Sequence, residues 1–381
     1  MSNVDITIPV SEITIDGVAV PISGTTSIVN KLGKVLDKSI ESLDTSDLEG
    51  ATIISASMLA KCPNLVYVGI PSSVTEIENQ AFYQSGLKTL TIPDTVLTLG
   101  TAIVAKNTQL EEVYIGNGIS ILPANTFFDD TALKKISIGD NIVNIGSQVF
   151  KNIDITQFCE YSGGSYYLRT RSGKLAYLIQ GTEDVLPVLV ADECTCIAPN
   201  AFEGLELNSQ YSPGVVLPDG LVYIGGNAFK NCTFLQSIVI PDSVREIGSS
   251  VFYGCTRLYH LTLSNNLKII PNSAFYNCSI MDDLIIPDSV EEISNNAFYG
   301  NDNMDIITLG SGIKTIGSSV FYGCTGLKTL NIKATFPPSL GNTNSIPSNV
   351  TTINIPTGTL DAYKNATNWS NFANKFVEKD M

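Results

Sequence analysis

Hydrophobic residues recur along this chain with a fixed period, most clearly between Leu235 and Phe321. Each repeat runs Leu-x-x-Ile/Leu-x-Ile/Leu, then Val/Leu-x-x-Ile, then Phe-x-x-Cys. In one repeat Leu261 and Leu263 flank the polar Thr262, which is the period of a strand with one buried face. The phenylalanines that mark the repeats stand 23 residues apart, at Phe229, Phe252, Phe275, Phe298 and Phe321.

A period of this length with Leu-x-x-Leu-x-Leu cores predicts a leucine-rich-repeat solenoid of the α/β repeat class. One coil cannot bury its apolar face alone, so each coil needs neighbours that share its core and its strand hydrogen bonds. We expect about 11–12 coils of 23 residues over residues 49–336, with Val104 in one of the phenylalanine positions. The phenylalanine side chains should fill the core of the coils from the side opposite the strands.

Both ends of the chain depart from the repeat. Residues 1–48 predict alternating strands with a turn at Asp16-Gly17, followed by an amphipathic helix over 27–43 that caps the solenoid. The hairpin before that helix, within residues 1–24, is either more cap or a docking element. Residues 337–381 predict a last strand and an aromatic capping helix over 359–377.

An insertion at 153–195 interrupts the period, because Phe150 and Phe202 are 52 residues apart. Two aromatic-rich runs flank Arg171-Ser172-Gly173, which is a hairpin signal. Insertions in solenoids often carry binding, and aromatic and Arg residues are enriched at interface hot spots. Two readings stay open: a structural spacer with a small core, or a binding element. The candidate contact residues of the second reading are Tyr166, Tyr167, Arg169 and Arg171.

Composition narrows the classes of function. The 381 residues carry a formal net charge of −15, which disfavours nucleic acid and anionic membranes as partners. No apolar run is long enough for a transmembrane helix, and the first residues lack the pattern of a signal peptide. Of the 8 cysteines, 5 occupy the same repeat position and predict small buried free thiols, which suggests folding in a reducing compartment.

The sequence predicts neither an enzyme nor a metal or cofactor site. Only 1 histidine is present, so a catalytic triad has one candidate imidazole. Phosphate-binding glycine motifs are missing, and the Cys194-Thr-Cys196 spacing does not suit zinc. The outward side of the strand ladder, where solenoids of this kind bind, mixes acidic and basic residues and suits a protein or glycan partner. The candidate contact residues there are Tyr67, Tyr114, Tyr259 and His260.

The repeat Leu-x-x-Ile-x-Ile-Pro-Asp-Ser-Val-x-x-Ile-Gly-x-x-Val/Ala-Phe-x-Gly/Asn-Cys at 235–255 and 284–298 resembles the BspA-like, or Treponema pallidum type, leucine-rich repeats. The insertion around Gly173-Lys174-Leu175 and the ending Thr359-Leu360-Asp361 are also similar to that family. The resemblance covers about residues 50 to 378. It implies a surface-exposed protein associated with adhesion to host proteins or other cells.

Two functions arise as hypotheses. The first is a non-enzymatic surface adhesion protein that recognises a protein or glycan on a host or neighbouring cell, through the repeat ladder or the inserted hairpin. The second is a structural or receptor-binding component of a larger particle, such as a virion decoration or fibre, docked by residues 1–24. The reduced-looking cysteines and the missing secretion signal motivate the second.

Overall fold

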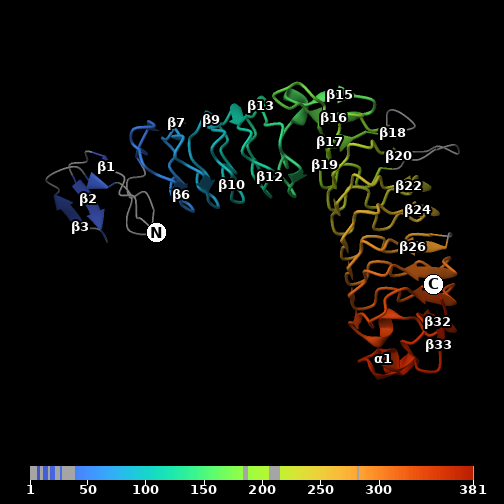
Figure 1. Ribbon diagram of the computed structural model, residues 1–381. Helices are drawn as coiled ribbons and strands as arrows, with labels where there is room; N and C mark the ends of the chain where they lie inside the picture. Colours follow the sequence, from blue (N-terminus) through green and yellow to red (C-terminus); the bar gives the residue numbers. More distant parts are fainter. Residues whose placement is uncertain are drawn as a thin grey trace. The chain divides into compact units, whose positions relative to one another are not determined.

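The computed structural model describes residues 39–182, 188–205, 215–280 and 283–380, together with four short strands among the first 27 residues. The chain divides into two compact units. The first comprises the described residues up to Glu160 and the segment Leu168–Leu175; the second comprises Tyr161–Tyr167 and the described residues from Ala176 onwards. Each unit is a stack of parallel coils (Figure 1).

Each coil of the first unit contributes two short strands. Those at the Leu-x-x-Leu-x-Leu positions form the front ladder: β5 (Ser42–Leu43), β7 (Tyr67–Val68), β9 (Thr89–Ile92), β11 (Glu112–Ile115) and β13 (Lys135–Ser137). The short strands that follow the front strands along the chain form the second ladder: β6 (Ile53–Ile54), β8 (Glu76–Ile77), β10 (Thr98–Leu99), β12 (Ile121–Leu122) and β14 (Asn144–Ile145). Pairing is parallel and advances by one repeat, as Val113 opposite Leu90 shows.

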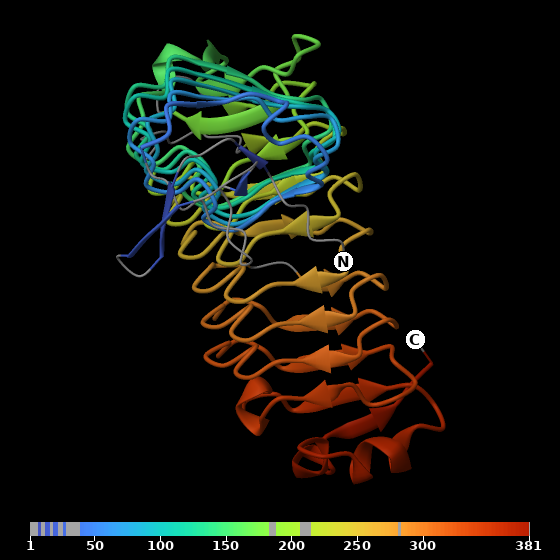
Figure 2. The same ribbon diagram turned by 90° about the vertical axis from the view of Figure 1, so that its left-hand side faces the viewer.

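The second unit repeats both ladders, and Figure 2 shows its coils stacked from yellow to red. Its front ladder contains β18 (Val188–Leu189), β20 (Val215–Val216), β22 (Ser237–Val239), β24 (His260–Thr262), β26 (Leu284–Ile286), β28 (Ile306–Leu309), β30 (Thr329–Ile332), β32 (Thr352–Ile355) and β33 (Phe376–Glu378). Its second ladder contains β17 (Tyr177–Gly181), β19 (Cys196–Ile197), β21 (Tyr223–Ile224), β23 (Glu246–Ile247), β25 (Ile269–Ile270), β27 (Glu292–Ile293), β29 (Thr315–Ile316) and β31 (Ser339–Leu340).

The predicted phenylalanine spine is confirmed. The rings of Phe229, Phe252 and Phe275 are fully buried and stack with centroids 5.2 and 5.4 Å apart. The buried Val104 takes the equivalent position in the first unit, as expected. Leu261 and Leu263 point inward as the alternation predicts. The buried side chains at this position, most of them phenylalanines, therefore form a continuous core in each unit.

The back of each coil is held by a third set of backbone hydrogen bonds, here called the turn ladder. The N–H groups of Ser250, Phe252 and Gly254 donate to carbonyls in the next coil at 2.7–2.9 Å. Ser250 and Gly254 have φ of 56° and 73°, a region that small or polar residues tolerate best. This explains why Ser, Asn and Gly recur at these positions.

The cysteines that follow the repeat phenylalanines in the Phe-x-x-Cys pattern are also buried, as predicted. The thiol of Cys255 donates to the Phe229 carbonyl at 3.0 Å, and that of Cys278 donates to the Phe252 carbonyl at 3.1 Å. Burial raises the pKa of the Cys255 thiol to about 12. These thiols are therefore protonated hydrogen-bond donors at neutral pH.

Three expectations need correction or fall outside the described residues. The solenoid has about 14 turns, where the sequence pattern predicts 11–12. The helix predicted over 27–43 lies mostly outside the described residues, and its last two residues form strand β5. Near the amino terminus β1 (Thr7–Ile8) pairs with β4 (Thr26–Ser27). Strand β2 (Glu12–Ile15) pairs antiparallel with β3 (Val18–Pro21), whereas the predicted turn at Asp16-Gly17 lies outside the described residues.

The carboxyl-terminal cap is only partly helical, so the helix predicted over 359–377 is wrong in extent. Helix α1 (Leu360–Asn365) is followed by the 3-10 turn Trp369–Phe372 and then by strand β33. The helix ends because Ala366 takes an extended conformation, with φ of −75° and ψ of 142°. The aromatic core of the cap is as expected, since Trp369 is buried and its indole N–H donates to the Pro338 carbonyl at 2.7 Å. Other 3-10 turns are Ile155–Gln157 and Thr343–Ser345.

Candidate functional site

The candidate residues on the front ladder fall into two pairs. Tyr67 and Tyr114 lie in the first unit, and Tyr259 and His260 lie in the second. Tyr67 and His260 are exposed, whereas Tyr114 and Tyr259 are half-buried. All four stand on the outward side of their strands or beside them, as the alternation predicts.

Tyr114 is the centre of a surface cluster on β11 and β13. Its hydroxyl donates to Glu112 Oε2 at 2.5 Å and accepts from Lys135 Nζ, 2.8 Å away. The ammonium also lies 5.1 Å from the centre of the tyrosine ring. These bonds lower the pKa of the Glu112 carboxyl and raise the pKa of Lys135. The cluster therefore keeps both charges at neutral pH but already satisfies the Tyr114 hydroxyl.

The insertion begins with three consecutive strands that neighbour one another in one sheet: β15 (Glu160–Ser162), β16 (Ser165–Leu168) and β17. Tyr167 is fully buried, and its hydroxyl accepts a hydrogen bond from the Ala191 backbone N–H at 3.1 Å. Tyr167 is therefore not a contact residue, and its assignment to the binding surface is wrong. Tyr166 is half-buried, and its ring contacts that of the exposed Tyr161 in a tilted arrangement, with centroids 5.2 Å apart and an interplanar angle of 56°.

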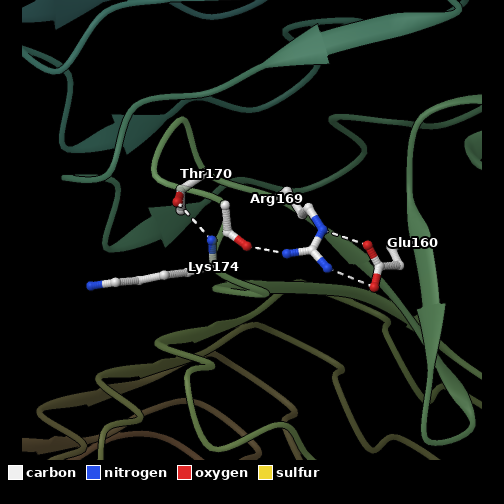
Figure 3. Close-up of polar contacts among 5 residues, drawn as sticks. Glu160, Arg169, Thr170 and Lys174 are labelled. Atoms are coloured by element: carbon white, nitrogen blue, oxygen red, sulfur yellow. Dashed lines mark hydrogen bonds and ion pairs between the residues drawn. The ribbon is translucent and has the colours of Figure 1, made fainter.

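The turn that follows β16 is tied together by Arg169 (Figure 3). Its guanidinium donates to both carboxylate oxygens of Glu160, with the Nη2–Oε1 bond at 2.7 Å, and to the Gly173 carbonyl. The Arg169 guanidinium lowers the pKa of the Glu160 carboxyl. Within the same turn, the Lys174 backbone N–H donates a hydrogen bond to the Thr170 hydroxyl oxygen. Arg169 thus holds this turn in shape.

The same turn docks on the front ladder of the first unit. Thr170 forms a parallel bridge with Ile138, and the Arg171 backbone N–H donates to the Ile138 carbonyl at 2.9 Å. The Arg171 guanidinium lies 3.0 Å from Asp94 Oδ1, and the Ser172 hydroxyl donates to Asp140. These contacts favour the structural reading of the insertion over a freely projecting binding loop.

Sequence reasoning missed a row of aliphatic side chains that face solvent on the second unit's front ladder. Leu189, Val216, Val239 and Ile285 are 55%, 53%, 62% and 63% exposed. Leu189 stands opposite Val216, and Val239 stands opposite Thr262. Val216, Val239, Thr262 and Ile285 hold the same position of successive repeats, so the four aliphatic residues belong to one column, which the polar Thr262 interrupts. We call these four residues the apolar row. The alternation of each strand could have revealed them, because both faces of Val215-Val216 and Leu284-Ile285-Ile286 are apolar.

A groove of about 570 Å³ runs along part of the apolar row. Its lining includes the strand residues Val216, Val239 and Thr262 and the turn residues Asp219 and Asp242. Asp242 accepts hydrogen bonds from the Asn265 backbone N–H at 2.8 Å and from its side-chain amide at 3.2 Å. These bonds lower the pKa of the Asp242 carboxyl. The groove therefore combines an apolar wall with a rim that stays anionic.

The described residues contain no group of three or more His, Cys, Asp or Glu side chains placed to hold a metal ion. Over the same residues no helix has the length and hydrophobicity needed to span a bilayer. The fold and its exposed ladders define a repeat scaffold of the leucine-rich class, a class that is generally non-enzymatic and serves protein interactions.

The chain belongs to the family described as BspA type leucine rich repeat region, which is often surface-associated. The family model matches residues 39–162, 187–303, 222–343 and 268–372. The resemblance seen in the repeat motif is thereby confirmed. No curated protein matches the sequence.

Several solved structures are similar to this chain. The pneumococcal vaccine antigen PcpA is 16% identical over 98% of this chain and 88% of its own, with a TM-score of 0.40. The Treponema pallidum leucine-rich-repeat protein is 23% identical over 52% of this chain and 92% of its own, with a TM-score of 0.43. A leucine-rich cell surface protein from Faecalibacterium prausnitzii A2-165 is 23% identical over 74% of this chain and 58% of its own, with a TM-score of 0.32.

Proposed function

We propose that this chain is a non-enzymatic, surface-exposed adhesion protein that holds a protein partner on the front ladder of its second unit. The observation that carries the proposal is the apolar row. Four aliphatic side chains more than half exposed, in one column of a ladder, are an unusual feature of a soluble surface and mark interaction sites. The family supports the coarser statement that the chain is an interaction scaffold.

The charges around the row support a partner with basic residues. Asp219 and Asp242 line the groove beside the row, and Asp283 is exposed at the start of β26. The chain as a whole carries a net charge of −15. A partner that inserts aliphatic or aromatic side chains between flanking Lys or Arg residues complements this surface. Tyr259 and His260, on the neighbouring strand, extend the contact area.

The remaining candidate residues fit this proposal less well. Arg169 and Arg171 are bonded to Glu160 and Asp94 within the chain, and the Tyr114 hydroxyl is bonded to Glu112. A partner would have to replace these bonds before gaining its own. Among the residues of the first unit, Tyr67 presents the most accessible aromatic ring, and we assign it a secondary role.

The test compares charged substitutions on two equally exposed aliphatic residues. Beads coated with Val239→Asp should attach to host or neighbouring cells at least about tenfold more weakly than wild-type beads, because a buried unpaired carboxylate opposes docking. Leu97→Asp, in the second ladder of the first unit, is the matched control, since Leu97 and Val239 are both 62% exposed. His260→Ala and Tyr259→Ala should weaken attachment by less.

Treating the cells beforehand identifies the partner's class. Protease treatment should abolish attachment, whereas glycosidase treatment should leave it intact. Attachment that survives protease but not glycosidase would reject a protein partner. Equal attachment by wild-type and Val239→Asp beads would reject the apolar row as the site.

The alternative function, a component of a larger particle, is favoured by one observation. The pairs β1–β4 and β2–β3 are antiparallel and stand apart from the parallel ladders. On this alternative, deleting residues 1–24 should release the chain from its particle while its melting temperature stays the same. Sedimentation of the particle with and without the deletion measures this, and retention of the shortened chain would count against docking by this segment.

A further inference from the structure

A second aromatic stack runs beside the phenylalanine spine on the back of the second unit. Its four rings belong to consecutive coils and have centroids 4.6, 4.5 and 5.2 Å apart: Tyr253, Tyr276, Tyr299 and Tyr322. The first three are half-buried, but Tyr322 is 46% exposed. Each inner ring is sandwiched by its neighbours, whereas Tyr322 has a tyrosine on one side only.

Backbone hydrogen bonds identify the residue that lies opposite Tyr322 in the next coil. The Phe321 N–H donates to the Ser345 carbonyl at 3.2 Å, so the buried Ile346 takes the place of the phenylalanine. Pro347 consequently stands opposite Tyr322. A proline ring is shorter than a tyrosine ring, so the outer part of the Tyr322 face has no cover from this coil.

The turn ladder stops at the same place. In preceding coils the N–H of Asn277 donates to the Tyr299 carbonyl and that of Gly300 to the Tyr322 carbonyl, both at 2.8 Å. The N–H of Gly323 holds the equivalent position, but it makes no hydrogen bond with the residues that the structure describes. These N–H groups are directed at the next coil along the chain. An unused donor therefore lies beside the uncovered ring.

Both features border a pocket of about 570 Å³. Its other lining groups are mostly amides and hydroxyls, including Thr325, Asn344 and Asn371. Its one charged side chain, Lys375, donates from Nζ to the Val350 carbonyl at 2.6 Å and to the Ser348 carbonyl at 3.1 Å. Its lining contains no carboxylate.

We infer that this pocket binds the pyranose ring of a glycan. The apolar C–H face of the sugar stacks on Tyr322 as the next member of the tyrosine column, and sugar hydroxyls pair with the Gly323 N–H and the asparagine amides. A wholly apolar ligand would leave the Gly323 N–H unpaired, which opposes its burial. An anion would find a single ammonium with two of its three N–H groups already bonded to backbone carbonyls. A neutral polyhydroxylated ring satisfies both the aromatic and the amide groups.

This site is separate from the protein-binding ladder of the proposed function, so the two succeed or fail independently. The test is saturation-transfer NMR of the full-length chain with the methyl glycosides of glucose, galactose, mannose and N-acetylglucosamine. At least one glycoside should receive saturation at its ring protons. Tyr322→Ala should raise its Kd about tenfold or abolish the signal, and Tyr322→Phe should retain it.

Tyr67→Ala is the matched control, because Tyr67 is also 46% exposed and lies in the other unit; it should leave the signal intact. Melting curves of the variants establish that each is folded. Absence of saturation for all four glycosides would overturn the inference, as would an equal signal with Tyr322→Ala. Binding of N-acetyltyrosinamide in place of the glycosides would also overturn it, since the pocket would then accept an aromatic side chain of a protein.

Discussion

Phe252→Ala should lower the free energy of unfolding by about 3–5 kcal/mol, the usual cost of truncating a buried phenylalanine. The ring is fully buried and sandwiched between Phe229 and Phe275, with interplanar angles of 9° and 10°. Its removal leaves a cavity that two neighbouring rings border. Because adjacent coils share one core, the loss should spread beyond the mutated coil.

Urea denaturation monitored by circular dichroism measures the loss for Phe252→Ala. Tyr253→Ala is the matched control: it removes the adjacent ring of the same coil, which is half-buried and stacks on Tyr276 alone. The control should cost clearly less. If both variants unfolded at the wild-type midpoint, the spine would not be the element that holds the coils together.

The spine and the strand positions could be predicted from the sequence because they depend on one periodic rule. Every coil must place a large side chain at the same point, and the 23-residue spacing reveals it. The number of turns could not, because the spacing of the spine is irregular around the insertion. Phe150 and Phe202 are 52 residues apart, and Phe202 and Phe229 are 27 residues apart, although Phe202 is buried and stacks on Phe229.

Side-chain direction inside the insertion was equally hard to predict. Tyr166 and Tyr167 are adjacent, and alternation alone does not say which one faces the core. The contacts that decide it come from distant parts of the chain, such as the Ala191 N–H bonded to Tyr167. The tyrosine stack differs, since tyrosines directly after phenylalanines at 23-residue intervals were visible in the sequence. The stack ends at Tyr322 because Pro347 stands opposite it in the next coil, and the repeat period does not predict a proline there.

The cysteine position contains an exception in the first unit that has a measurable consequence. Where other coils place Cys, this unit has Asn107 and then Asp130. Asn107 reproduces the role of the thiol, since its side-chain amide donates to the Phe82 carbonyl at 3.0 Å. Asn301 does the same in the second unit, with a 2.7 Å bond to the Phe275 carbonyl. This position therefore calls for a hydrogen-bond donor.

Asp130 can donate only when it is protonated. It is fully buried, Oδ1 accepts from the Asn107 N–H at 2.7 Å, and Oδ2 has no partner among the described residues. Burial raises the pKa of this carboxyl well above its ordinary value of 3.8. The folded state therefore binds the proton more tightly than the unfolded state. The stabilisation is complete below the unfolded pKa and is lost as the pH rises through the folded one.

Asp130→Asn should consequently stabilise the chain at neutral pH, by about 1–3 kcal/mol, because an amide supplies the donor without a buried charge. The gain should shrink toward zero as the pH falls to about 4, where the wild-type carboxyl is itself protonated. Melting temperatures across this range measure the effect. Asp192→Asn, which removes one exposed negative charge, is the control for net charge and should show no such dependence.

The shape of the pH profile separates this mechanism from a general effect of charge. If Asp130→Asn were equally stabilising at every pH, the benefit would come from packing and not from the proton. A destabilised variant at neutral pH would mean that the buried carboxylate is paired with a group that the amide cannot satisfy. Only a gain that grows with pH fits a buried acid in a position where Asn107, in the preceding coil, provides a donor.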